Sequence, residues 1–158
     1  MPAPEISVDV LIDHNITSPM AMQEIRQIVT TTAHERGFQC GELGVRLTTD
    51  KEIHRINQLH LQHDYPTDVI SFDYGSNGDN ITGELVVSVE TANHQSNAIG
   101  WSAHHELALY LVHGTLHISG MDDQQSSDRL EMRKAERRVL EKLGIHLPES
   151  ISPDGGFQ

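Results

Sequence analysis

Several features are scarce or missing in this chain of 158 residues, and each absence excludes a class of structure. A single cysteine, Cys40, excludes an intrachain disulfide. Because Cys40 is near a turn, we expect it to serve as a small apolar residue rather than as a reactive thiol. No apolar run is as long as the roughly 20 residues of a membrane-spanning helix. The first residues include acids and no basic segment, so a signal peptide is not expected. These absences together predict a cytoplasmic protein without membrane contact.

Basic residues are also scarce, since 11 Lys and Arg stand against 23 Asp and Glu and give a formal net charge of −12. Nucleic-acid binding depends on neutralising phosphates with Lys and Arg, so this balance opposes tight non-specific binding. RNA would have to bind in a local basic cleft or at a metal ion, or be delivered by a protein partner. One basic cluster alternates with acids at helical spacing and is interpreted as a solvated face rather than an RNA contact. It comprises Arg129, Arg133, Lys134, Arg137 and Arg138.

The chain is long enough for one domain with a sizeable core, and its hydrophobic content of 37% argues against wholesale disorder. We predict that residues 1–147 form this single domain. Residues 148–158 contain two prolines and two glycines, and they are expected to form a flexible tail.

Hydrophobic periodicity and turn signals predict alternating strands and helices. Strands are expected at residues 6–12, 42–48, 68–73 and 84–89. Helices are expected at residues 18–36, 49–61, 90–98, 102–119 and 126–143, with Ser18, Thr49 and Ser102 among the capping residues. The last two strands flank a turn-rich loop and should pair as an antiparallel hairpin. The pattern predicts an α/β or α+β fold with a small mixed sheet of about four strands covered by helices.

The segment HGTLHISGMDD at residues 113–123 carries the clearest chemical signal. His113 and His117 are four residues apart, so on a helix their imidazoles lie on one face and can bind one ion. Gly120 can end that helix, which lets Asp123 or Asp122 turn back as a third ligand. Two histidines and a carboxylate suit a catalytic zinc ion that keeps one position open for water. The segment before His113 is apolar, which predicts that this helix is buried.

The same segment argues against one class of zinc enzyme. HExxH metalloproteases place a glutamate general base directly after the first histidine, and here that residue is Gly114. The HxxxHxxGxxD spacing is nevertheless similar to that of metzincin proteases. A metalloprotease-like hydrolase therefore stays open as an alternative.

Three blocks in the chain resemble the YbeY family of metal-dependent, single-strand-specific endoribonucleases. HGTLHISGMDD resembles the family's HGxLHLxGxDH, DYPTDVISF at 64–72 resembles DxPTDVLSF, and GELVVS at 83–88 resembles GDIxIS. The resemblance covers roughly residues 5–145 and implies one YbeY-like hydrolase domain with a buried metal helix. Because Asp122 matches the family's own aspartate, the resemblance favours Asp123 as third ligand, where the family usually has histidine.

The resemblance further implies one Zn²⁺ per chain, held by His113, His117 and Asp123. It implies action in rRNA maturation, especially at the 3′ end of small-subunit rRNA, and in ribosome quality control. The expected partners are rRNA and the small ribosomal subunit or its assembly proteins.

The catalytic residues are not identified by the sequence, and only weak candidates emerge. Thr67 and Asp68 lie in the PTDV block, which the family places beside the metal. The family usually has an arginine three residues before the aspartate that opens DxPTDVLSF. That aspartate is Asp64 here, and Leu61 occupies the position of the arginine. A phosphate contact of that arginine is absent, or it is made by another residue such as His63 or His60. Leu61 and the acidic charge keep a further alternative open, a non-catalytic ribosome-assembly factor whose zinc is structural.

Overall fold

The structure is a computed structural model that describes residues 5–61 and 68–146. Its strands are β1 (Ile6–Ile12), β2 (Cys40–Thr48), β3 (Val69–Asp73) and β4 (Asn80–Ser88). Its helices are α1 (Met22–Glu35), α2 (Asp50–Ile56), α3 (Val89–Ile99), α4 (Ala103–Ile118) and α5 (Ser126–Lys142), and a π-helical turn, η1 (Asn57–Leu61), follows α2. The predicted tail at 148–158 lies outside the described residues.

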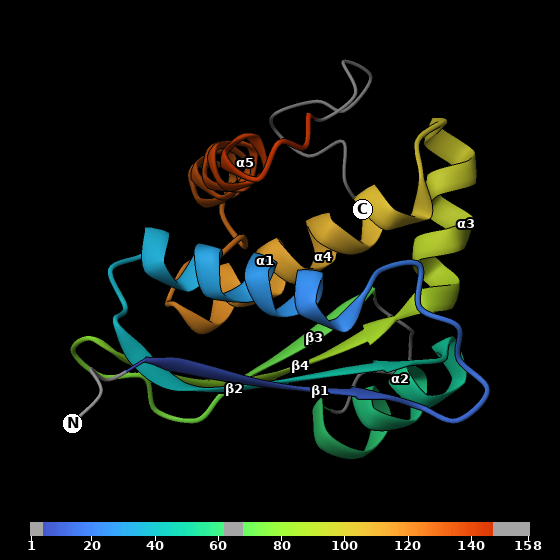
Figure 1. The fold of residues 1–158 in the computed structure, drawn as a ribbon, viewed down its shortest axis with the longest axis horizontal. Coiled ribbons are helices and arrows are strands. Elements are labelled where there is room, and N and C mark those ends of the chain that lie inside the picture. The colour runs from blue at the N-terminus through green and yellow to red at the C-terminus, as the bar shows by residue number, and fades with distance from the viewer. Residues whose placement is uncertain (1–4, 62–67, 147–158) are drawn as a thin grey trace.

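The four strands form one mixed sheet in the order β1-β2-β4-β3. β2 runs parallel to both β1 and β4, and β3 pairs antiparallel with β4. Helices α1 and α4 cover one face of the sheet, α2 lies on the opposite face, and α5 packs on the outer side of α4 (Figure 1). The predicted α/β fold with a four-stranded mixed sheet is confirmed, and so is the antiparallel pairing of β3 with β4.

Side-chain caps fix several helix starts where the sequence predicted them. The Thr49 hydroxyl accepts from the Glu52 N–H at 3.2 Å, and the Ser102 hydroxyl accepts from the His105 N–H at 3.1 Å. The expected cap at Ser18 is wrong, because α1 begins only at Met22. The Ser18 hydroxyl instead bonds both backbone groups of Met20, so it closes a local turn before the helix.

Besides shifts of one or two residues at other ends, two predicted elements differ clearly from the structure. β4 begins at Asn80 rather than residue 84, because its first residues pair with the start of β2 from Cys40 onward. The single helix expected at 49–61 is divided into α2 and the π-helical turn η1. In both cases the element type was predicted correctly and tertiary pairing or local backbone geometry set its limits.

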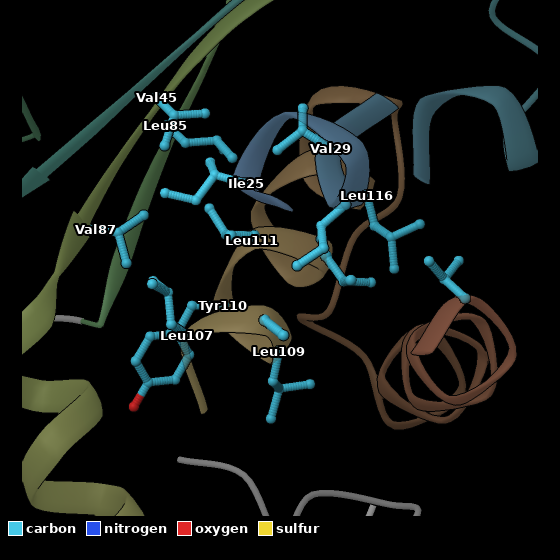
Figure 2. Close-up of a cluster of buried hydrophobic side chains, with 14 of the residues drawn as sticks. Ile25, Val29, Val45, Leu85, Val87, Leu107, Leu109, Tyr110, Leu111 and Leu116 are labelled. Carbon is cyan, nitrogen blue, oxygen red and sulfur yellow. The ribbon is translucent and has the colours of Figure 1, made fainter. Parts of the chain in front are cut away.

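Helix α4 is the centre of the core. Twelve of its sixteen residues are buried, from Glu106 through Thr115 and including Leu116 and Ile118. Figure 2 shows α4 side chains meeting those of α1, such as Ile25, and those of the sheet, such as Leu85. Burying a leucine or isoleucine side chain stabilises a fold by about 1.5–3 kcal/mol, so this cluster is a major source of stability. The prediction that the histidine-bearing helix is buried is confirmed.

Two glycines allow α4 to lie close to the sheet. A Cβ on Gly114 would be 2.6 Å from Leu85 Cδ2 and 3.0 Å from Val69 Cγ2. A Cβ on Gly83 in β4 would be 2.4 Å from a backbone oxygen of β3 and 2.9 Å from Ile118 Cγ2. The Ser71 hydroxyl also donates to the Gly114 carbonyl at 3.0 Å. The sheet, rather than a ligand, is therefore the close neighbour that requires glycine at position 114.

Arg46 links strands β1 and β2 to helix α2 on the other face of the sheet. Its guanidinium donates to both carboxylate oxygens of Asp13 at 2.9 and 2.8 Å, and to Glu52 at 3.0 Å. The neighbouring Arg55 and then Arg46 lower the pKa of Glu52 to about 2, and Arg46 also lowers the pKa of Asp13. These ion pairs therefore stabilise the fold at neutral pH.

In residues 5–61 and 68–146, no helix combines the length and the apolar character that crossing a membrane requires.

We predict that Gly114→Ala destabilises the fold by about 1–3 kcal/mol, because its Cβ would overlap buried side chains of the sheet. In an ordinary helix interior the same change stabilises by up to about 1 kcal/mol, so the sign of the effect is diagnostic. Urea unfolding of Gly114→Ala, with the exposed α3 change Asn97→Ala as control, measures it. A stabilised Gly114→Ala variant would contradict the close packing.

We also predict that Arg46→Met lowers the free energy of unfolding by on the order of 1 kcal/mol at pH 7. The pKa values of Asp13 and Glu52 are lower in the folded chain than their ordinary values of 3.8 and 4.5. Their contribution is complete above about pH 4.5 and is lost as the pH falls toward 2. The difference between wild type and variant in urea unfolding should therefore shrink at pH 3. An unchanged difference would show that the charge pairing is not its source.

Candidate metal centre

The last turns of α4 bring two imidazoles together. His113 and His117 point their Nε2 atoms at each other across 3.1 Å. The Asp123 Oδ2 atom lies 3.5 Å from His113 Nε2 and 3.3 Å from His117 Nε2. Among the described residues, these three form the group of His, Cys, Asp or Glu whose ligand atoms converge closely enough to hold a metal ion.

The turn after α4 places the carboxylate. Gly120 adopts a positive φ of 107°, and its N–H bonds the His117 carbonyl at 3.0 Å. The Met121 N–H bonds the Leu116 carbonyl at 3.0 Å, which completes the helix end and reverses the chain. The Asp122 carboxylate accepts the Asp123 N–H at 2.8 Å and thereby supports the turn. The geometry brings Asp123, rather than Asp122, to the histidines.

The spacing of the three atoms fits a metal ion. A tetrahedral zinc ion with bonds of about 2.0–2.1 Å separates its ligand atoms by about 3.3 Å. The observed separations of 3.1, 3.3 and 3.5 Å are close to that value. Two nitrogens and one carboxylate oxygen form the donor set of a site with three protein ligands, which is typical of catalytic zinc. The arrangement can therefore hold a divalent cation.

The two histidines experience different electrostatic surroundings. Burial lowers the pKa of His113, but the Glu136 carboxylate, together with the charges of Asp68 and Asp123, outweighs burial and raises it. Burial and the neighbouring His113 lower the pKa of His117. The carboxylates of Glu136, Asp68 and Asp123 favour a positive charge at His113. A bound cation would meet the same favourable charge, so the site is electrostatically suited to a metal ion.

Glu136 is a site residue that the sequence analysis did not identify. Its Oε2 atom lies 2.5 Å from His113 Nδ1, and its Oε1 atom accepts from Arg133 Nη1 at 2.5 Å. Glu136 is fully buried and Arg133 is buried, so the interpretation of the late basic cluster as a solvated face is wrong for Arg133. A signal was present, because Glu136 is four residues after Met132 and three before Val139, on the apolar stripe of α5.

The structure describes only some of the weak catalytic candidates. His63 and Thr67 lie outside the described residues, as do the side chains of His60 and Leu61. The Asp68 carboxylate accepts the N–H of Val69 at 2.8 Å, and its negative charge acts on His113. Asp68 therefore lies directly before β3, and its charge acts on His113 as well as on Glu106 and Tyr110.

A second buried polar group lies at the other end of α4. Glu106 is buried and accepts from the Trp101 indole N–H at 2.5 Å. Burial raises the pKa of Glu106, and the Trp101 and Tyr110 side chains partly oppose this effect. Trp101 is thus a partly buried anchor of the α3–α4 connection.

Comparison with known proteins adds independent evidence. Residues 9–144 match the family model described as "Endoribonuclease YbeY". An "Endoribonuclease YbeY" from Rhodopirellula baltica is 42% identical over 97% of this chain and 84% of its own length. The protein of that name from Bacteroides thetaiotaomicron is 33% identical over 78% of this chain and 93% of its own. In fold, the chain resembles the solution structure of TM1509 from Thermotoga maritima, with a TM-score of 0.58 and 18% identity over 87% of this chain and 91% of that one.

We predict that Asp123→Ala weakens zinc binding at least about tenfold, because it removes one of three ligands. Asp122→Ala should keep its zinc, since the Asp122 carboxylate bonds the backbone of the turn. Titration with zinc in the presence of a competing chelator measures both affinities. If Asp123→Ala kept full zinc binding while Asp122→Ala lost it, Asp122 would be the ligand.

Proposed function

The chain belongs to the YbeY endoribonuclease family, and we propose that it is a zinc-dependent, single-strand-specific endoribonuclease that acts in rRNA maturation. The observation that carries the proposal is the convergence of His113, His117 and Asp123 within 4.8 Å of one another at the end of α4. We extend the proposal to the 3′ end of small-subunit rRNA and to ribosome quality control. The small ribosomal subunit or its assembly proteins are the proposed partners, and this substrate implies a cytoplasmic location. We also propose that residues 1–147 act as one catalytic domain.

The residues of the site divide the work of holding one ion. His113 and His117 offer Nε2 lone pairs, and the Asp123 carboxylate adds a negative charge. Bound there, Zn²⁺ would polarise a phosphoryl oxygen and supply an activated water for phosphodiester hydrolysis. The charge of Asp68 acts on His113, and Asp68 is the described candidate for general base. His63 and Thr67 stay weak catalytic candidates without an assigned role.

The metalloprotease-like alternative is disfavoured by the packing at Gly114. In HExxH enzymes the residue at this position carries the general base. Here any side chain at position 114 would meet Leu85 and Val69 of the sheet within 3.0 Å. The position is therefore closed to a glutamate, and not only occupied by another residue.

The non-catalytic assembly factor is separated from the nuclease by the openness of the metal site. Structural zinc sites are usually closed by four protein ligands, whereas catalytic sites keep an exchangeable position. Three described side chains converge here, and Asp123 is 37% exposed. These features favour a catalytic ion that solvent and substrate can reach.

We predict that the zinc-loaded protein cleaves a structured RNA with single-stranded ends, and that His117→Ala loses at least about 100-fold of this activity. His117 supplies one of only two nitrogen ligands in the cluster, so its loss removes the ion. His94→Ala, which changes an exposed histidine on α3, is the matched control and should retain wild-type cleavage.

Gel analysis of end-labelled RNA distinguishes the outcomes. Cleavage by wild type and His94→Ala alone supports the nuclease. Equal cleavage by His117→Ala would indicate a contaminating nuclease and reject the proposed site. No cleavage by any protein with zinc bound, either alone or with small ribosomal subunits added, would favour the assembly factor.

A further inference from the structure

We propose that Glu136, supported by Arg133, is a positioning residue that fixes the tautomer of His113 and so sets the affinity of the metal centre. The inference rests on the proposed metal site. It concerns residues of α5, which supplies none of the three converging ligands.

The hydrogen bond defines which nitrogen of His113 is available. A carboxylate only accepts hydrogen bonds, so His113 must carry its hydrogen on Nδ1, which lies 2.5 Å from Glu136 Oε2. The lone pair is then on Nε2, the atom that faces His117 and Asp123. With the opposite tautomer, the Nε2 hydrogen would point into the cluster and block coordination.

Burial makes this contact demanding. Glu136 is fully buried, and a lone carboxylate at such a position would be strongly destabilising. Arg133, one helical turn earlier on α5, donates to the second oxygen at 2.5 Å and supplies the compensating charge. Each carboxylate oxygen therefore has its own donor, and the carboxylate cannot rotate without losing one of them.

The second histidine is held differently. The Nε2 atom of His117 lies 3.1 Å from His113 Nε2 and 3.3 Å from the Asp123 carboxylate, which is partly exposed rather than buried. The His117 side chain is 28% exposed, against 9% for His113. His113 is thus held on its buried side by the Glu136–Arg133 pair, whereas His117 and Asp123 lie on the solvent side of the centre. Removing the Glu136 carboxylate should therefore alter the tautomer and orientation of His113 more than those of His117.

Glu136→Gln tests the proposal with little change in shape. Its amide presents one acceptor and one donor, whereas both neighbours, His113 Nδ1–H and Arg133, are donors. Either the amide nitrogen faces Arg133, or it faces His113 and selects the tautomer that opposes metal binding. Glu131→Gln is the matched control, because Glu131 is on the same helix and its side chain is 65% exposed.

Three measurements on the full chain decide the proposal. Zinc affinity is measured by chelator competition, and Co²⁺ absorption reports the ligand geometry. The His113 tautomer is measured by ¹⁵N NMR of the metal-free protein at a pH at which His113 is neutral, a readout that needs neither metal nor RNA. We expect zinc binding 10–100-fold weaker in Glu136→Gln, an altered Co²⁺ spectrum and loss of the Nδ1–H form, with Glu131→Gln unchanged.

Glu136→Asp serves if the glutamine variant does not fold. It keeps the charge opposite Arg133 but is one methylene shorter, so the contact with His113 lengthens and an intermediate loss of zinc affinity is expected. Folded variants with wild-type zinc affinity and an unchanged tautomer would overturn the proposal. An Nε2–H tautomer of His113 in the wild type would overturn it without any variant.

These outcomes separate the inference from the proposed function. A protein that binds zinc tightly, loses affinity in Glu136→Gln and yet cleaves no RNA would support the role of Glu136 while rejecting the nuclease. A wild type that binds no zinc would overturn the effect on affinity together with the metal centre.

Discussion

The close contact between helix α4 and the β3–β4 edge of the sheet is the constraint on which the rest of the structure depends. Glycines at 83 and 114 remove the side chains that would keep helix and sheet apart. The helix then buries twelve of its residues against α1, the sheet and its other neighbours. A helix packed on so many sides is a rigid support, and it fixes the positions of His113 and His117. Rigid elements position ligands more accurately than loops do.

The candidate metal centre lies where this buried helix reaches the surface. His113 is deep and supported by Glu136 and Arg133, whereas Asp123 comes from the turn that follows Gly120. The cluster thus changes from buried at His113 to partly exposed at His117 and Asp123 over the width of a single ion. If the cluster holds the proposed ion, such a difference would let Glu136 and Arg133 act on the site from the inside while a substrate approaches from the outside.

The fold and the three-residue cluster could largely be predicted from the sequence, because their signals are local. The i,i+4 histidines, Gly120 and the apolar run before them indicate a buried helix with a ligand pair and a turn. Ser18 was misread because its hydroxyl bonds Met20 in a turn rather than α1. The sequence assigns Arg133 to a solvated face and does not single out Glu136, because i,i+3 charge pairs look alike on a solvated face and in a core. Only their place on the apolar stripe of α5 distinguishes them, and their partner His113 is 20 or more residues away in sequence.

The short distance along the chain between the three converging side chains has a consequence for the order of assembly. Residues 113–123 form a helix end and one tight turn, so bringing them together costs little loop-closure entropy. The buried carboxylate of Glu136 arrives from a separate helix and requires tertiary docking. The spacing of the three converging side chains is thus set within one local segment, whereas the contact between Glu136 and His113 depends on the docking of the last helix.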